Sequence, residues 1–220
     1  MILLYNMNSF RGRYKVITQQ PATNIISIAE LKNRLKIPSN ITSVDSTLTD
    51  ALNAAVDEFM DYTQSGLLDT VFSCDLYGFS NINLRYINSD QISLYQNNIH
   101  TLNSIKYAKD GVLTTISQDV YNFTKQAYKA TVSLKSNQKW IDASDIDEQY
   151  NNDPLGVVKV EFISGFGATA TDIPAKIKNA LVSYVRYYYN NTGDCGDCGG
   201  EASQFYSLIS EYRYYGTIDL

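Results

Sequence analysis

This chain of 220 residues has little of the side-chain chemistry on which many enzymes rely, with one histidine, one tryptophan and three cysteines. Because His100 is the only histidine, a Ser/His/Asp or Cys/His mechanism has a single possible base. His100 stands between Asn98 and Asn103, just before a segment that we expect to be a strand, which is typical of a surface or turn histidine. No spaced pair of carboxylates stands out. The sequence therefore predicts a protein that is not an enzyme.

The chain also lacks long apolar runs and an excess of positive charge. No run approaches the roughly 20 residues needed to cross a bilayer, so we expect no membrane association. Residues 1–8 have no basic segment and too short an apolar part for a secretory signal, so we expect synthesis in the cytoplasm without export. The net charge of -5 argues against a protein that grips duplex DNA through its phosphates. It suits a surface that DNA slides past, because like charges repel.

The three cysteines, Cys74, Cys195 and Cys198, cannot form an even disulfide framework, which fits a reducing cytoplasm. The spacing Cys195-Gly-Asp-Cys198 would let two thiolates reach one zinc ion, or let one thiolate resolve the other. Only the distant Cys74 and His100 remain as further ligands, and the motif lies in a glycine-rich loop. We therefore predict no metal and no cofactor. Cys195 and Cys198 remain candidate residues in the alternative that the chain is a thiol- or zinc-dependent protein.

The periodicity of apolar residues changes twice along the chain. Ser27 and Glu30 have the spacing of a capping box, which opens a short helix that ends before Pro38. A second helix is predicted over residues 46–64, where apolar residues recur at steps of three and four, with Gly66 placed to end it. From residue 68 to 163 the pattern is short, alternating and rich in β-branched and aromatic residues. Strands are predicted at residues 70–76, 82–86, 92–95, 104–108, 130–134 and 157–164.

Helical patterning returns after a glycine turn late in the chain. Gly165-Phe-Gly167 follows the last strand, and Pro174 lies in the first turn of an amphipathic helix that stops at residues 190–193. A last helix is predicted to end near Gly216. The glycines formally fit a dinucleotide fingerprint, but no parallel strand completes a βαβ unit, so a turn with positive φ explains them better.

These patterns predict an α+β fold, in which a small bundle of about four helices carries a β-rich antiparallel insertion between its second and third long helices. The expected organisation is an extended arm over residues 1–24, a helical core over residues 25–66 and 172–216, an insertion over residues 67–168 and a tail over residues 217–220.

Tyrosine is concentrated near the C-terminus, where the last 37 residues contain eight of the 18 tyrosines. Three consecutive tyrosines on a helix spread over about 200° of its circumference, so they cannot all face one core. Tyrosine at the surface is typical of protein interfaces, although an AT-rich genome would also favour this residue. We expect a partner interface near the end of the last helix, made by Tyr206, Tyr212, Arg213, Tyr214 and Tyr215.

Several segments in a fixed order carry a resemblance to a known family. They are residues 18–22 and 26–37, residues 50–63 with their closing Tyr-Thr pair, residues 104–107 followed by Asp110-Gly111 and Trp140, residues 160–167, residues 173–180, and Tyr212-Arg213. Together they resemble the head–tail connector proteins of tailed phages, the portal adaptors or head-completion proteins. The resemblance covers most of residues 18–213 and does not extend to residues 1–17 or to the Cys195–Cys198 loop.

The resemblance implies a structural virion protein at the head–tail junction, without catalysis. Such proteins form a ring, in this family a dodecamer, that docks below the portal protein, extends the channel for genomic DNA and offers a surface to the next neck or tail protein. The expected partners are therefore the portal, neighbouring copies of the chain and the next neck component, with DNA passing through the lumen unbound. The alternative within the same class is another neck protein, a stopper or a tail-completion factor.

Overall fold

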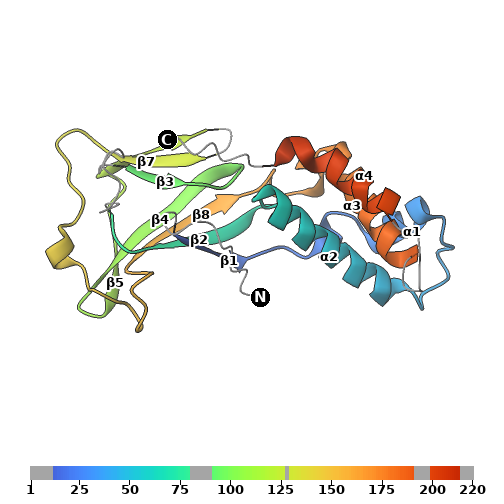
Figure 1. Cartoon of the computed structure of the whole chain (residues 1–220), viewed down its shortest axis with the longest axis horizontal. Coiled ribbons are helices and arrows are strands. Elements are labelled where there is room, and N and C mark those ends of the chain that lie inside the picture. The colour runs from blue at the N-terminus through green and yellow to red at the C-terminus, as the bar shows by residue number, and fades with distance from the viewer. Residues whose placement is uncertain (1–11, 80–90, 127–128, 191–198, 214–220) are drawn as a thin grey trace. The chain divides into compact units, whose positions relative to one another are not determined.

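The computed structural model describes residues 12–79, 91–126, 129–190 and 199–213 of the chain (Figure 1). Its contacts divide the chain into two compact units. A β unit combines residues 12–18 with Thr70–Ser164, and a helical unit combines Gln19–Asp69 with the chain from Gly165 onwards. The predicted α+β fold with four helices and antiparallel sheets is confirmed.

In the described ranges, the helical unit contains four α-helices joined by loops and 3-10 turns. The helices are α1 (Ile28–Leu35), α2 (Asp45–Thr63), α3 (Ala175–Asn190) and α4 (Gly199–Ile209), and the turns are η1 (Ala22–Asn24), η3 (Ala170–Asp172) and η4 (Ser210–Tyr212). Helix α3 packs against both α2 and α4, while α1 contacts α2 and α3. The stripe predicted for α2 is its buried face, since these residues are hidden from solvent: Leu48, Ala51, Leu52, Ala55, Val56, Phe59 and Met60.

The ends of α1 and α2 differ in detail from the sequence expectations. Ser27 Oγ accepts a hydrogen bond from Glu30 N at 3.2 Å, as a capping box requires, but the Glu30 carboxylate binds Arg34 one turn later. Helix α2 ends at Thr63, and the next residue, Gln64, takes the left-handed conformation with a φ of 56°. The predicted stop at Gly66 is therefore two residues late, because the polar Gln64 adopts the left-handed conformation expected of glycine.

The β unit holds two antiparallel sheets. The strands are β1 (Arg13–Thr18), β2 (Thr70–Leu76), β3 (Gln91–Leu94), β4 (Ile99–Lys109), β5 (Val112–Thr115), β6 (Tyr121–Lys125), β7 (Ala130–Leu134) and β8 (Val158–Ser164), and the 3-10 turn η2 (Ala143–Asp145) precedes β8. The order is β1-β2-β8-β4-β5 in the larger sheet and β3-β7-β6 in the smaller. Strand β8 lies at the centre of the larger sheet, beside the long β4 (Figure 1).

Strand β8 alternates strictly between buried and half-buried residues, so the larger sheet has two different faces. One face is apolar, with Val158, Val160 and Phe162 fully buried. The Phe162 ring stacks on Phe72 from β2 at 5.8 Å between ring centroids and meets the edge of Tyr14 from β1 at 6.2 Å. The opposite face carries charged side chains in register across four strands, and these form the site described below.

Part of the arm predicted for residues 1–24 has regular structure, and residues 1–11 lie outside the described residues. Residues 13–18 form β1, which pairs with β2 from Arg13 opposite Asp75 onwards, and residues 22–24 form η1. The strand was missed because its alternation is of charge and not of apolarity: Arg13 and Lys15 point to the charged face and Tyr14 to the apolar one. Strands β5 and β6 were also missed, and the strand predicted at residues 82–86 lies outside the described residues.

The glycine turn after β8 is a close crossing of two chain segments. Phe166 N donates to Leu67 O at 3.0 Å, and Asp69 N donates to Gly167 O at 2.9 Å, so the segments before β2 and after β8 are bonded to each other. Gly167 has a φ of 152°, as expected for a turn glycine, whereas Gly165 is required for another reason. A Cβ at Gly165 would lie 2.7 Å from the carbonyl carbon and oxygen of Leu68.

We predict that Gly165→Ala lowers the free energy of unfolding by about 1–3 kcal/mol, because the added methyl group would push against main chain that cannot rotate away. Urea denaturation followed by circular dichroism measures this change. Gly78→Ala is the matched control, since a Cβ at Gly78 meets nothing within 4 Å. Equal midpoints for the two variants would show that the crossing tolerates a side chain.

Candidate functional site

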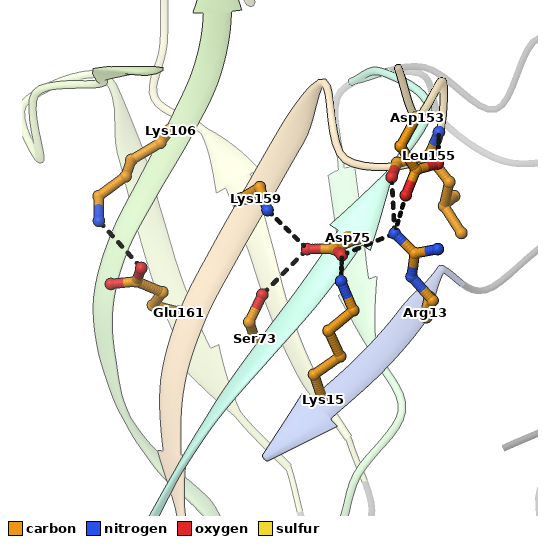
Figure 2. Close-up of polar contacts among 9 residues, drawn as sticks. All are labelled: Arg13, Lys15, Ser73, Asp75, Lys106, Asp153, Leu155, Lys159 and Glu161. Atoms are coloured by element: carbon orange, nitrogen blue, oxygen red, sulfur yellow. Dashed lines mark hydrogen bonds and ion pairs between the residues drawn. The ribbon is translucent and has the colours of Figure 1, made fainter. Parts of the chain in front are cut away.

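The charged face of the larger sheet carries a set of side chains that we call the charge ladder: Arg13, Lys15, Asp75, Lys159, Glu161 and Lys106 (Figure 2). Register explains why they meet. Arg13 lies opposite Asp75, Asp75 opposite Lys159, and Lys159 opposite Lys106, so one row crosses β1, β2, β8 and β4. Cross-strand neighbours of this kind have side chains within contact distance.

Asp75 is the centre of the charge ladder. Its side chain is fully buried, yet it contacts Lys15 Nζ at 2.6 Å, Arg13 Nη2 at 3.1 Å and Lys159 Nζ at 3.6 Å. Ser73 Oγ donates a further hydrogen bond to its carboxylate at 3.0 Å. Burial would raise the pKa of Asp75, but the hydrogen bond from Lys15 and the charges of Lys159 and Arg13 outweigh burial and lower it. The carboxylate is therefore ionised at neutral pH and holds no proton to donate.

Arg13 joins the start of β1 to the turn before β8. Its guanidinium binds the carboxylates of Asp75 and Asp153, and Nη2 also donates to Leu155 O at 2.9 Å. Asp153 in turn accepts from Leu155 N at 2.9 Å. The hydrogen bond from Arg13, together with its charge, lowers the pKa of Asp153. One arginine thus ties three chain segments that are far apart in sequence.

The far end of the charge ladder is more open. Lys106 Nζ binds Glu161 at 2.9 Å, and Ser104 Oγ donates to the same carboxylate at 3.1 Å. About a third of each of these two charged side chains is exposed. A lysine ammonium has three donors, so Lys106 can hold Glu161 and still bind a carboxylate of another molecule. The ladder can therefore bind a partner surface electrostatically.

Cys74 lies on the opposite, apolar face, next to Tyr14. The thiol is fully buried, and burial raises the pKa of Cys74 to about 12. Burial likewise raises the pKa of Tyr14, whose hydroxyl accepts a hydrogen bond from Tyr95 N at 2.9 Å. Because the reactive form of cysteine is the thiolate, Cys74 is not a nucleophile at neutral pH.

The residues considered for metal or thiol chemistry do not assemble into a site in the part of the chain that the structure describes. Within that part, no three histidine, cysteine, aspartate or glutamate side chains are close enough to share a metal ion. His100 lies in β4, where its Nδ1 atom is 2.9 Å from Thr101 Oγ1. Cys195 and Cys198 lie outside the described residues.

The tyrosines predicted to meet a partner pack partly against their own unit. Tyr206 from α4 donates its hydroxyl to Glu58 of α2 at 2.6 Å, and that bond raises the pKa of Tyr206 to about 12. The Tyr206 ring contacts the Tyr62 ring at 5.1 Å between centroids. The Arg213 guanidinium lies over the same Tyr62 ring, with its Cζ atom 4.9 Å from the ring centroid. Tyr212 meets Phe166 edge-on at 5.8 Å.

Exposure separates these residues. Arg213 is exposed, while Tyr206 and Tyr212 are half-buried, so each presents one part to solvent and another to the helical unit. Tyr188 on α3, from the run of three tyrosines, is 42% exposed. Tyr214 and Tyr215 lie outside the described residues. The predicted interface thus remains a prediction; of its described members, Tyr206 and Arg213 form a cluster around Tyr62, while Tyr212 packs on Phe166.

The charge ladder was not predicted from the sequence. Its signal is present as polar or charged residues two apart in three strands: Arg13 and Lys15, Ser73 and Asp75, Lys159 and Glu161. Each pair alone reads as the solvent face of an ordinary strand. Which strands are neighbours had to be known before these pairs could be joined into a site.

The sequence matches no family model, and no curated protein is significantly similar to it. Solved structures do match the fold. A chain from the neck of an empty GTA particle computed with C6 symmetry has a TM-score of 0.71 and 18% identity, over 94% of this chain and 98% of that one. Chains from the virion of a native gene transfer agent (GTA) particle and from the neck of a native GTA particle computed with C12 symmetry have TM-scores of 0.70 and 0.67, at 18% and 17% identity with the same coverage.

At these identities the match establishes a shared fold along nearly the whole of both chains. In addition, no helix in the described ranges has the length and apolar character needed to span a membrane.

We predict that Asp75→Asn lowers the free energy of unfolding at pH 7 by about 3 kcal/mol, because it leaves Lys15 and Arg13 without their buried counter-ion. Since the pKa of the folded-state carboxyl lies below its unfolded value of about 3.9, its contribution is complete above that pH and is lost as the pH falls through the lower, folded pKa. Urea midpoints of the native chain and the variant should therefore converge on acidification.

The control is Asp145→Asn, which breaks the exposed pair with Lys109 and should leave the midpoint unchanged. A gap between Asp75→Asn and the native chain that stays constant down to about pH 3 would contradict the role of an ionised Asp75.

Proposed function

We propose that this chain is a structural protein of the neck of a tailed phage or phage-like particle, where it acts as a head-to-tail adaptor. The observation that carries the proposal is the fold match to chains of GTA necks, over 94% of this chain and 98% of those chains. Copies would form a ring, as the C6 and C12 symmetries of the matched necks suggest, and the ring would dock on the portal protein. It would be located in the virion at the head–tail junction.

The chemistry of the chain is consistent with a mechanical role. The Asp75 carboxylate is bound by Arg13, Lys15 and Lys159, and the buried Cys74 offers no thiolate nucleophile at neutral pH. A net charge of -5 suits a channel through which DNA passes without binding. A ring also needs two different side surfaces on each copy for head-to-tail contacts. The helical unit and the β unit are two chemically different parts of the chain from which such surfaces can be built.

We further propose that the cluster around Tyr62 contacts the portal or the next neck protein, through Arg213 together with the exposed parts of Tyr206 and Tyr212, and with Tyr214 and Tyr215. Arginine and tyrosine are enriched at the energetic centres of interfaces. Arg213 already lies over an aromatic ring, so its side chain loses little freedom on binding.

The test is to mix the purified full chain with the portal protein of the same particle and to analyse the mixture by native mass spectrometry and cryo-electron microscopy. We expect the chain alone to be monomeric or weakly associated, and the mixture to contain rings in direct contact with portal. A ring placed one layer away from portal would favour the alternative, a stopper or tail-completion factor. No binding at all would refute the neck assignment.

We predict that Arg213→Glu abolishes binding to its neighbour in this assay while leaving the circular dichroism spectrum and thermal midpoint unchanged, because Arg213 is exposed. Arg186→Glu on α3 is the matched control, since Arg186 is also exposed and is changed by the same charge. Loss of folding in Arg213→Glu would mean that the contact with Tyr62 stabilises the helical unit itself. Equal loss of binding in both variants would show a general effect of charge.

A further inference from the structure

Strand β1 has no short connection along the chain to the other strands of its sheet, so only non-covalent contacts hold it there. Along the sequence, residues 19–69 of the helical unit separate Thr18, the last residue of β1, from Thr70, the first residue of the rest of the β unit. An edge strand attached in this way can leave its sheet without unfolding any other strand, because β2 is its only neighbour among the strands that the structure describes.

The place that β1 occupies is a specific binding site, which we call the β1 slot. Besides the main chain of β2, it offers the buried carboxylate of Asp75 to Arg13 and Lys15, and the ring of Phe162 to Tyr14. The Tyr14 hydroxyl is bonded as well, to Tyr95 N. The slot thus recognises the sequence Arg-Tyr-Lys, which occurs in this chain only at residues 13–15.

The exit from β1 has the features of a hinge. Residues 17–19 are all exposed, and Ile17 interrupts the register with β2 and leaves 57% of its apolar side chain in solvent. Directly after them, Gln20 donates to Ala168 O at 3.3 Å and Ala22 is buried, so the chain is anchored again. Rotation within these three residues would redirect β1 while both flanking segments keep their structure, over a reach of roughly 10 Å.

From the slot and the hinge together, we propose that β1 is exchanged between copies when the ring assembles. In the free chain β1 fills its own slot. In the ring, β1 of each copy fills the slot of the next copy, so the partner recognised by the slot is the N-terminal segment of a second copy of this chain. This inference rests on the proposed function, because it needs copies arranged side by side.

Exchange of β1 loses few contacts. The same Asp75 carboxylate, the same Phe162 ring and the same β2 main chain are bonded before and after, so the two arrangements differ mainly in which copy supplies the strand. Once copies are held beside one another on a docking platform, the neighbouring strand is present at a high effective concentration. Every copy then gives one strand and receives one, which is a head-to-tail contact that closes into a ring.

Tyr14 and the native Cys74 lie opposite each other in the pairing of β1 with β2, which provides a direct test. Cross-strand partners are spaced as a disulfide requires. We would make Tyr14→Cys with Cys195→Ser and Cys198→Ser, assemble the full chain on the portal protein with its thiols reduced, add diamide to the finished assembly, and analyse it on a denaturing gel without reductant. The control keeps Tyr14 and carries the two serine changes alone.

We expect the free variant to run as a monomer with an internal disulfide, and the assembled variant to run mostly as covalent dimers and higher multiples that a reductant dissolves. The control should show no cross-link in either state. Rings in which the disulfide joins two positions of one chain would overturn strand exchange and leave the proposed function intact. If even the control forms no ring with portal, the proposed function fails, and the exchange fails with it.

A second variant keeps the Tyr14 ring, which Tyr14→Cys removes. Lys15 and Ser73 are the adjacent cross-strand pair, so Lys15→Cys with Ser73→Cys, Cys74→Ala, Cys195→Ser and Cys198→Ser places the disulfide on the charged face instead, where Asp75 keeps its contacts with Arg13 and Lys159. Circular dichroism and the fluorescence of Trp140, the only tryptophan, check that the variant is folded. The same gel pattern is expected, and cross-links confined to single chains would again contradict exchange.

Discussion

The β unit depends on a single buried charge. An ionised carboxylate taken out of water costs several kcal/mol unless cations and hydrogen bonds replace the solvent. Asp75 meets that condition with cations from β1 and β8 and with a hydroxyl from its own strand. This requirement also fixes the register of β1. A shift of β1 by one residue would carry Arg13 and Lys15 to the apolar face and leave the charge of Asp75 uncompensated. Charge therefore sets the register of the edge strand, where apolar packing alone would specify it weakly.

The elements predicted from sequence are those whose signal is local. Helix α2 and strands β2 and β8 carry their own apolar periodicity, so their existence and type could be read from single segments. Strand β1 and the charge ladder could not, because their meaning lies in pairs such as Arg13 with Asp75 and Arg13 with Asp153, separated by 62 and 140 residues. Gly165 belongs to the same class, since its constraint comes from the main chain of Leu68 and not from its own turn.

The C-terminal tyrosines show that residues predicted to meet a partner can also hold their own unit together. Their density suggested a surface made for a partner, whereas Tyr206 and Tyr212 also hold α4 and η4 against Glu58 and Phe166. A residue with both roles keeps its ring in a defined position before any partner arrives. Such a surface binds with a smaller loss of side-chain entropy than a flexible aromatic tail would.

The crossing at Leu67–Asp69 and Gly165–Gly167 has a consequence for how such a protein could evolve. Since the chain enters and leaves the Thr70–Ser164 segment through two strands already bonded to each other, the ends of that segment are fixed neighbours. A different domain whose termini are adjacent could replace this segment without moving a helix. Strand β1 would then lose its binding site, because its Arg13 and Lys15 pair with Asp75 of the replaced segment. Replacing the segment would therefore require replacing β1 as well.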